Sequence, residues 1–385
     1  MNVLIVPMFA LSRMGGPWSR AQAIAAAFEN AGHHVVLGIS DDGNCIDPCV
    51  SDTCQLPVPA PLGLPMGISS RTFPIAQKLG IAGRKPVHSF EEVLWLTGAL
   101  SYGYERESVE AICDAIERCS IDAVYSEYSL PTIIAAQTCG IPAFGSFSYT
   151  TQASYASNPA KAKGLRKLLG ELGLPTPASA LGVFDWLDRR FVPSCHRLEP
   201  IDDAKTELVG FLRNPPAAET GERDCILVYL GAGSIPQRLV ERTVLEAFED
   251  YEGAVYVAGC ETERQQGVVR FASRFDFSQL LPKACCFVHH GGQNSTMDAL
   301  AYGTPQVIAP GQVFERRYNA ESIERTGAGI KLESFDAEKL RYACLRVIGD
   351  HSFAESASAL HRELAAGGGA TRIVEIVEQA ISVSQ

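Results

Sequence analysis

The residues with the clearest capacity for chemistry lie in the segment 288–320. A short apolar run predicts a buried strand that ends near Val288. Two histidines and two glycines (289–292) follow it, and the apolar spacing of residues 295–302 predicts a helix. Glycine lets the backbone approach a ligand closely, and the first N–H groups of a helix attract anions. The segment therefore has the form of a phosphate-binding turn between a strand and a helix.

Polar side chains at the start of this predicted helix supply further hydrogen-bond donors. Asn294, Ser295 and Thr296 follow the glycines, and Asp298 comes three residues after Ser295. Ser295 and Asp298 also fit a capping box, which would give them a structural role. Spacing alone supports the two interpretations equally.

The residues beyond the helix favour a ligand site. Gly303-Thr304-Pro305 ends the helix, as glycine and proline after a C-terminus do. A second short strand is predicted over 306–309, and Glu315 and Asn319 follow it. His290 alone is more often a turn residue than a ligand contact, so the combination of these side chains carries the prediction.

The chain repeats one pattern in its two halves. An apolar strand (2–9), a glycine turn, a helix (19–31) and a strand (35–39) form a βαβ unit, and a buried strand over 225–230 begins the pattern again. This predicts an α/β fold with two Rossmann-like parallel-sheet domains facing across a cleft. The predicted parts are a domain over 1–204, a linker over 205–224, a second domain over 225–369 and a helix over 370–385 that crosses back to the first domain.

Composition narrows the class of protein. The chain has 385 residues, 46% of them apolar, and a net charge of −11, which disfavours binding to nucleic acid. Its twelve cysteines are scattered, several within apolar runs, which predicts a reducing, cytoplasmic location. No apolar run approaches the roughly 18 residues that a membrane span needs.

Two local clusters have alternative interpretations. Cys45, Cys49 and Cys54 form a loop-like group without a nearby fourth ligand, so we expect no metal there. A basic run predicts either a solvated helix face or weak peripheral contact with an anionic membrane surface or acidic acceptor. It comprises Lys161, Lys163, Arg166 and Lys167.

At the segment 288–320 the chain resembles the donor-binding signature of family-1 (UDP-glycosyltransferase-like) glycosyltransferases of GT-B fold. Weaker likeness extends to Gly32-His33-x-Val35, Gly140-Ile141-Pro142 and Leu208-Val209-Gly210, so it covers nearly the whole chain. The signature reads here as His290-Gly291-Gly292-Gln293-Asn294-Ser295-x-x-Asp298, Gly303-Thr304-Pro305, Pro310, Glu315-Arg316 and Asn319-Ala320.

The resemblance implies transfer of a sugar from a nucleotide diphosphate sugar to a small-molecule or lipid-like acceptor, with inversion and without a metal. Asp298 would bind the ribose hydroxyls, and Glu315 would bind hydroxyls of the sugar. The N-terminal half would bind the acceptor. The pyrophosphate would be held by the backbone and side chains of His290, Gly291, Gly292, Asn294 and Ser295, with the turn at Gly233 and Ser234 lining the same site.

The chain departs from the family pattern at the catalytic position. The family carries a histidine on its first glycine turn, where this sequence has Pro17. The acid that orients that histidine corresponds to Glu127, which could act directly as the base or be only an exposed carboxylate at a strand end. Asp298 replaces a glutamate, and Arg316 replaces a glutamine and could pair with an acidic sugar. Two alternatives therefore stay open: a non-catalytic accessory protein that binds sugar nucleotides, and a nucleotide-sugar epimerase or retaining enzyme.

Overall fold

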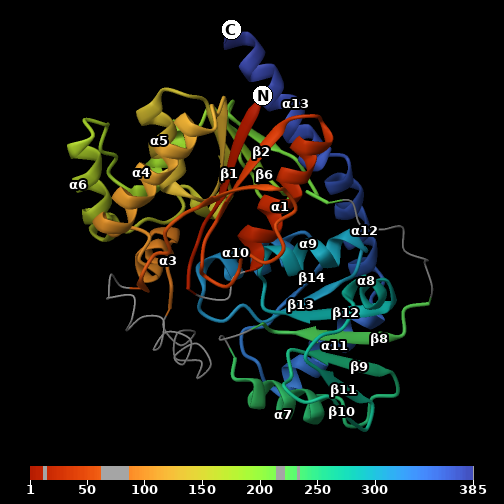
Figure 1. Cartoon of the computed structure of the whole chain (residues 1–385). Coiled ribbons are helices and arrows are strands. Elements are labelled where there is room, and N and C mark those ends of the chain that lie inside the picture. The colour runs from red at the N-terminus through yellow and green to blue at the C-terminus, as the bar shows by residue number, and fades with distance from the viewer. Residues whose placement is uncertain (12–14, 62–85, 214–221, 232–234, 385) are drawn as a thin grey trace. The chain divides into compact units, whose positions relative to one another are not determined.

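The computed structural model describes residues 1–11, 15–61, 86–213, 222–231 and 235–384 (Figure 1). The chain divides into two compact units. The N-terminal unit comprises Met1–Ile75, His88–Arg213 and Gly367–Gln385, and the C-terminal unit comprises Ala76–Val87 and Asn214–Ala366.

The N-terminal unit is built on a seven-stranded parallel sheet with the order β3-β2-β1-β4-β5-β6-β7. Strand β1, in the interior of this sheet, is almost entirely apolar and buried, because helices cover both faces of a parallel sheet. The strands are β1 (Asn2–Pro7), β2 (His34–Ile39), β3 (Asp52–Gln55), β4 (Ala123–Glu127), β5 (Ala143–Ser146), β6 (Arg189–Val192) and β7 (Thr206–Leu208).

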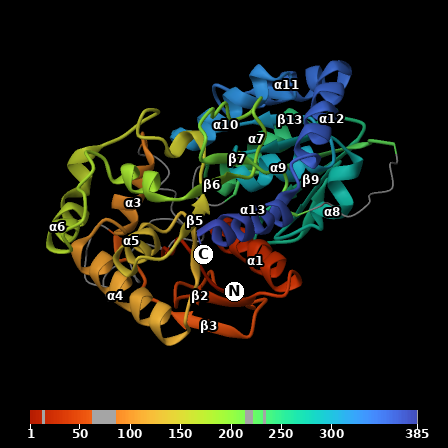
Figure 2. The ribbon, with the colours of Figure 1, turned by 90° about the horizontal axis from the view of Figure 1, so that it is seen from above.

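The last helix of the chain, α13 (Gly369–Ser384), belongs to this unit and lies beside α1 (Gly15–Asn30) (Figure 2). Ile373 and Val377 of α13 share a buried cluster with Ile24 and Phe28 of α1. The remaining helices are α3 (Phe90–Thr97), α4 (Tyr102–Arg118), α5 (Leu130–Cys139) and α6 (Lys163–Glu171), with short 3₁₀ turns η3 (Tyr149–Thr151), η4 (Pro159–Ala162) and η5 (Ala180–Trp186).

The C-terminal unit holds a second sheet with the order β10-β11-β9-β8-β12-β13-β14, in which β10 is antiparallel to β11 and the other pairs are parallel. The strands are β8 (Cys225–Tyr229), β9 (Ala254–Ala258), β10 (Arg264–Gln266), β11 (Val269–Ala272), β12 (Ala284–His289), β13 (Gln306–Ile308) and β14 (Gly329–Lys331). The helices are α7 (Gln237–Ala247), α8 (Phe277–Leu280), η6 (Leu281–Lys283), α9 (Gln293–Ala301), α10 (Phe314–Arg325), α11 (Ala337–Gly349) and α12 (Ser352–Ala365).

The two sheets reverse their strand order at equivalent places. The order changes direction between β1 and β4 in the first sheet and between β8 and β12 in the second. In open α/β sheets, ligands bind beyond the carboxyl ends of the strands at such a switch point. The two points direct attention to the residues after β1 and β4 and to those after β8 and β12.

Several elements were not predicted from the sequence. Residues 90–118 form two helices, α3 and α4, because Gly98 ends α3 in a left-handed conformation with φ of 86°. Strand β3 lies in the segment between β2 and α3, of which residues 62–85 lie outside the described part of the chain. Short strands such as β3 give too few residues for their alternation to stand out.

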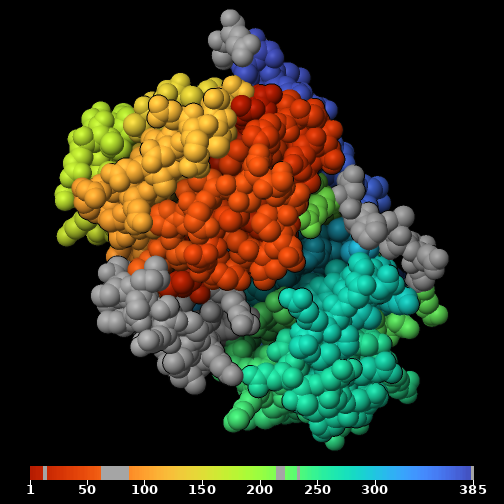
Figure 3. Space-filling view, in the orientation of Figure 1, coloured from red at the N-terminus to blue at the C-terminus, as the bar shows by residue number. Residues whose placement is uncertain are grey.

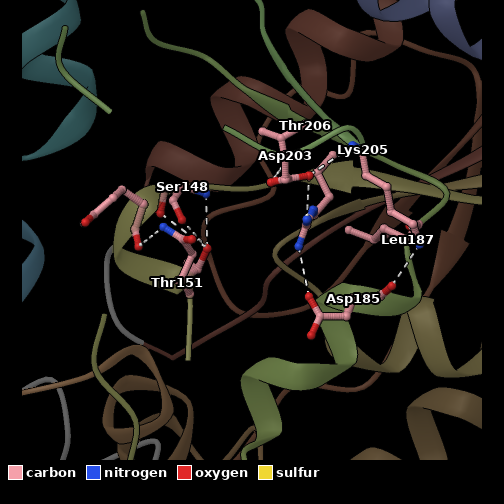
Figure 4. Close-up of polar contacts among 10 residues, drawn as sticks. Ser148, Thr151, Asp185, Leu187, Asp203, Lys205 and Thr206 are labelled. Carbon is pink, nitrogen blue, oxygen red and sulfur yellow. Dashed lines mark hydrogen bonds and ion pairs between the residues drawn. The ribbon is translucent and has the colours of Figure 1, made fainter. Parts of the chain in front are cut away.

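The linker expected over 205–224 is wrong at its first end. Residues Thr206–Leu208 form β7 of the first sheet, paired with β6. Lys205 Nζ donates to the carbonyl oxygens of Asp185 and Leu187, each at 3.2 Å (Figure 4). The charged residue Lys205 thus helps to hold β7 at the edge of the sheet.

The other end of that segment belongs to the C-terminal unit. The Arg223 guanidinium donates to the carbonyl oxygens of Ala284 at 2.7 Å and Tyr302 at 2.6 Å, and to Thr304 Oγ1 at 3.0 Å. A guanidinium has five donors, so one side chain can serve several acceptors around the C-terminus of α9. Residues 214–221 lie outside the described part of the chain.

Within the described residues, no helix is both long enough and apolar enough to cross a membrane.

Candidate functional site

The glycine turn predicted as the donor site lies at the switch point of the second sheet. Strand β12 ends at His289, and α9 begins at Gln293 with Gly292 as its N-cap. Since β12 lies between β8 and β13, the turn stands at the carboxyl edge of the sheet with its helix N-terminus beside it. Strand, turn and helix therefore meet as the sequence predicts.

His289 holds this turn in shape. Its ring is fully buried, and its Nδ1 accepts a hydrogen bond from the Gly291 N–H at 3.0 Å. The proton must therefore be on Nε2, which lies 2.8 Å from Gln306 Oε1 on β13. Burial lowers the pKa of His289 to about 4, so the ring is neutral near pH 7. His289 was not among the predicted site residues, because its partner Gln306 lies on another strand.

Gly291 is required by its surroundings. Its φ is +83°, and a Cβ there would lie 2.8 Å from the carbonyl oxygen of Arg316 and 2.9 Å from Ile308 Cγ2. Its own carbonyl accepts a hydrogen bond from Asn319 Nδ2 at 2.8 Å. Because the Gly291 N–H donates to His289, Gly291 contributes shape to the site and not a donor. The sequence predicts that the backbone after His290 binds the ligand, and the N–H group of Gly291 is not available for this.

His290 is a neutral, packed ring at the mouth of the turn. Burial, with smaller contributions from the nearby charges of Arg316 and His289, lowers the pKa of His290 to about 2. The ring meets Tyr229 edge-on with centroids 6.1 Å apart. Its Nδ1 is buried and has no hydrogen-bond partner among the described residues. A Cβ on Gly292 would come within 2.7 Å of His290 Nε2, so only glycine fits beside this ring.

The polar residues of α9 lie on its first two turns. Asn294 is half-buried, Ser295 is buried, and Asp298 is exposed. Asn294 and Asp298 are four residues apart and therefore share one face of the helix. The capping-box alternative for Ser295 and Asp298 is wrong, because the N-cap is Gly292 and Ser295 lies inside the helix.

Glu315 and Arg316 occupy the first turn of α10, after β13. Glu315 is half-buried. Burial lowers the pKa of the Arg316 guanidinium. The nearby Glu315 and Tyr229 oppose this shift but do not cancel it. An acid and a guanidinium thus stand next to the turn at Gly291. The other predicted donor residues, Gly233 and Ser234, lie outside the described part of the chain.

Glu127, the predicted base, lies at the switch point of the first sheet. It ends β4 and is fully buried, so the alternative of an exposed strand-end carboxylate is wrong. Its Oε1 accepts from Arg20 Nε at 2.6 Å, and its Oε2 accepts from the Ser146 hydroxyl. The Tyr125 hydroxyl lies 2.9 Å from Ser146 Oγ. Two donors within the unit therefore already bind the carboxylate.

The replacement of a histidine by Pro17 has a local structural effect. Pro17 lies in the first turn of α1, where proline costs no helical hydrogen bond. One turn further along, Arg20 places its guanidinium 5.6 Å from the ring centre of Tyr128 and pairs with Glu127. Sequence reasoning missed Arg20, because 107 residues separate it from Glu127.

The basic run is mostly engaged inside the N-terminal unit. Lys161 Nζ lies 3.6 Å from the ring centre of Trp95, and Lys167 Nζ lies 3.8 Å from that of Tyr102. Arg166 donates to the Pro159 carbonyl at 2.6 Å. The contact of Lys167 joins α6 to α4, and that of Lys161 joins η4 to α3, in the part of the unit that is coloured from orange to yellow-green in Figure 3. They favour the interpretation as a solvated helix face.

The cysteine cluster is not arranged for a metal. Cys54 is buried in β3, Cys45 is half-buried and Cys49 is exposed. Burial raises the pKa of each thiol, that of Cys45 to about 11, which disfavours the thiolate that a metal needs. Among the described residues, no three His, Cys, Asp or Glu side chains are grouped as metal ligands.

Comparison with known proteins agrees with this architecture. Residues 257–380 match the family described as erythromycin biosynthesis protein CIII-like, C-terminal domain. The chain is 35% identical over 114 residues to the aclacinomycin-T 2-deoxy-L-fucose transferase of Streptomyces galilaeus. That match covers 29% of this chain and only 26% of the transferase.

Two solved structures match over nearly their whole lengths. The calicheamicin glycosyltransferase CalG4 gives a TM-score of 0.74 at 17% identity, covering 99% of this chain and 98% of that one. The spinosyn rhamnosyltransferase SpnG complexed with thymidine diphosphate gives 0.71 at 17% identity, covering 98% and 100%. This chain has the GT-B fold of these glycosyltransferases. The predicted fold class is confirmed, and the similarity in sequence to glycosyltransferases lies in the C-terminal part of the chain, over residues 257–380.

Proposed function

We propose that this protein is a nucleotide-sugar-dependent glycosyltransferase, a hexosyltransferase that acts on a small-molecule or lipid-like acceptor. The observation that carries the proposal is the turn between β12 and α9. It combines a helix N-terminus, glycines at close approach and two neutral histidine rings at the switch point of a parallel sheet. Such a turn suits a pyrophosphate without a metal.

The assignment of donor groups follows the geometry of the turn. The N–H groups of the first turn of α9, with Asn294 and Ser295, are the donors for the pyrophosphate. Asp298 is exposed on the face that carries Asn294, and it accepts from the ribose hydroxyls. Glu315, in the first turn of α10, binds hydroxyls of the sugar. Because one structural neighbour was solved with thymidine diphosphate, we take thymidine diphosphate as the first nucleotide to test.

The reaction is proposed as a single displacement with inversion. The acceptor oxygen forms a bond to the anomeric carbon while the bond from that carbon to the phosphate oxygen breaks. The nucleoside diphosphate leaves with the bonding electrons, and the acceptor proton passes to a base. Glu127 is the candidate base, but its bonds to Arg20 and Ser146 leave it fewer lone pairs for an acceptor hydroxyl.

A second function is favoured by that same observation. With Pro17 in place of a histidine and Glu127 held in an ion pair, the chain could bind sugar nucleotides without transferring the sugar. Such a non-catalytic accessory protein would keep the turn at 290–292 and lack turnover.

The two functions are separated by acceptor-dependent release of nucleoside diphosphate. The wild type is incubated with thymidine diphosphate sugars and a panel of acceptor alcohols and phenols, and Glu127→Gln is measured beside it. Transfer by the wild type with a loss of about 10²–10⁴-fold in the variant, at unchanged nucleotide affinity, supports glycosyl transfer with Glu127 as base. Full turnover in Glu127→Gln contradicts the base assignment, and nucleotide binding without transfer supports the accessory protein.

A further inference from the structure

A second buried carboxyl group lies near the switch point of the first sheet and has no assigned role. Glu105, in the first turns of α4, is fully buried. Neither of its carboxyl oxygens has a hydrogen-bond partner among the described residues. Buried polar groups are almost always paired, because an unpaired one loses its hydration without compensation. An unpaired carboxyl therefore calls for a partner that the described residues do not provide.

A contrast within the same unit shows that the fold can pair such a group. Glu91 of α3 is also fully buried, but its two oxygens accept hydrogen bonds from the backbone N–H groups of Asn158 and Ala180. Glu91 thus has a structural role in joining three segments. Glu105 joins none in this way, although burial raises the pKa of its carboxyl well above the usual value and keeps it protonated.

Glu105 lines a cavity of about 10 Å³. This volume is close to the minimum that holds one water molecule, and hence one hydroxyl group. Apart from Glu105, the lining is mainly apolar and aromatic. It is formed by Met8, Leu94, Ala99, Tyr104, Tyr128, Ser129, Leu130 and Pro131.

The position of the cavity connects it to ligand binding. Met8 follows β1 directly, and Tyr128 and Ser129 follow β4, so the lining comes from the two strands that flank the switch point. Met8 and Tyr128 are only partly buried. Tyr128 also follows Glu127 in sequence and lies under the Arg20 guanidinium. The unpaired carboxyl therefore stands where an open α/β sheet places its ligand.

We propose that the cavity beside Glu105 receives one hydroxyl group of an apolar acceptor, with the Glu105 carboxyl as its hydrogen-bond partner. The inference rests on the proposed function only in naming the ligand an acceptor. A protonated carboxyl both donates and accepts, so it can pair with a hydroxyl in either sense. Glu105 thereby selects acceptors that carry a hydroxyl at this point.

The test uses two probes that differ in one group, 2-naphthol and 2-methoxynaphthalene, titrated into the full chain without a donor. Saturation-transfer NMR reports binding. The wild type should prefer 2-naphthol by about three- to tenfold, as expected for one hydrogen bond. Glu105→Leu should abolish the preference, and Glu105→Gln, which keeps a donor and an acceptor, should retain part of it.

Thermal unfolding of the same variants excludes a structural role. Glu105→Leu should raise the unfolding temperature by about 2–4 °C, because it removes an unpaired buried carboxyl. Glu91→Leu is the matched control and should lower it, because two backbone N–H groups lose their acceptor. A fall in unfolding temperature for Glu105→Leu would overturn the account of Glu105 as an unpaired group.

Three results in the titration would overturn the proposal. These are no saturable binding of 2-naphthol, equal affinity of the wild type for both probes, and a preference that survives in Glu105→Leu. Equal affinity for both probes would mean that the cavity holds only water. A preference that survives in Glu105→Leu would be steric in origin. A parallel titration with thymidine diphosphate separates this inference from the proposed function, since nucleotide can bind whether or not the naphthol preference exists.

Discussion

The residues at the two switch points of this protein differ in charge. In the C-terminal unit, the turn 290–292 has one neutral ring and two glycines, and His289 and Asn319 fix it by hydrogen bonds. In the N-terminal unit, Glu127 and Arg20 form a buried ion pair at the corresponding place. Because the turn carries no charge of its own, the partial positive charge of the helix N-terminus is available to attract an anion. A compensated ion pair beside an apolar cavity instead suits an uncharged molecule, which agrees with the proposal that one unit binds the donor and the other the acceptor.

The largest effect is expected from breaking the ion pair. Arg20→Met should destabilise the N-terminal unit by about 3–5 kcal/mol, because the fully buried Glu127 would keep a charge without its partner. Chemical denaturation followed by circular dichroism measures this. Arg213→Met is a control, since Arg213 is exposed and, among the described residues, donates only to the carbonyl of Ser19, which lies on α1 as Arg20 does. Equal stability of the two variants would show that the pair is not needed for the fold.

The next effect concerns the neutral turn and its pH dependence. Burial lowers the pKa of His289 from 6.5 to about 4, so below pH 6.5 the unfolded chain takes up a proton that the folded chain refuses. Stability is therefore full above pH 6.5 and is lost as the pH falls towards 4. The loss is on the order of 3 kcal/mol, since one pKa unit corresponds to about 1.36 kcal/mol.

Unfolding free energies at pH 7 and pH 5 test this in the wild type and in His289→Gln. The fall between the two pH values should be clearly smaller in the variant. His351→Gln, at an exposed histidine of the same unit, should leave the fall unchanged. An identical fall in the wild type and His289→Gln would contradict the neutral state assigned to this ring.

The smallest effect is expected at Asp298, which should affect binding and not folding. Asp298 is exposed on α9, so Asp298→Ala should change the unfolding free energy by less than about 0.5 kcal/mol. It should weaken thymidine diphosphate binding by about 1.5–3 kcal/mol, the usual contribution of hydrogen bonds to a charged group. Calorimetric titration measures the affinity. Glu355→Ala on the exposed face of α12 is the control, and equal affinities of the two variants would remove Asp298 from the site.

The sequence predicts those features of this protein that are formed by contiguous residues. The strand β12, its glycine turn and α9 are contiguous, so their residue types and spacing specify them, and the repeated βαβ pattern specifies the fold class. The contacts that decide chemistry are not contiguous. Arg20 reaches Glu127 across 107 residues, and Asn319 reaches Gly291 across 28. Neither spacing nor composition reveals which acid will be paired, so Glu127 was predicted as a base without its partner and Glu105 was not predicted.

The departure from the family pattern at Pro17 lies one turn before Arg20. Proline there keeps α1 regular at its start and leaves Arg20, one turn later, as the group that faces Glu127. The C-terminal unit keeps the glycosyltransferase-like pattern at 290–298, whereas the N-terminal unit departs from it near Glu127.

Titration calorimetry with thymidine diphosphate, in buffer containing a chelator of divalent metals, tests the donor site most directly. We predict saturable heat for one site per chain in the wild type, with weaker binding in His290→Ala. Binding should persist in the chelator, because neutral donors and the N-terminus of α9 hold the anion. The absence of heat with both thymidine diphosphate and uridine diphosphate would contradict the account.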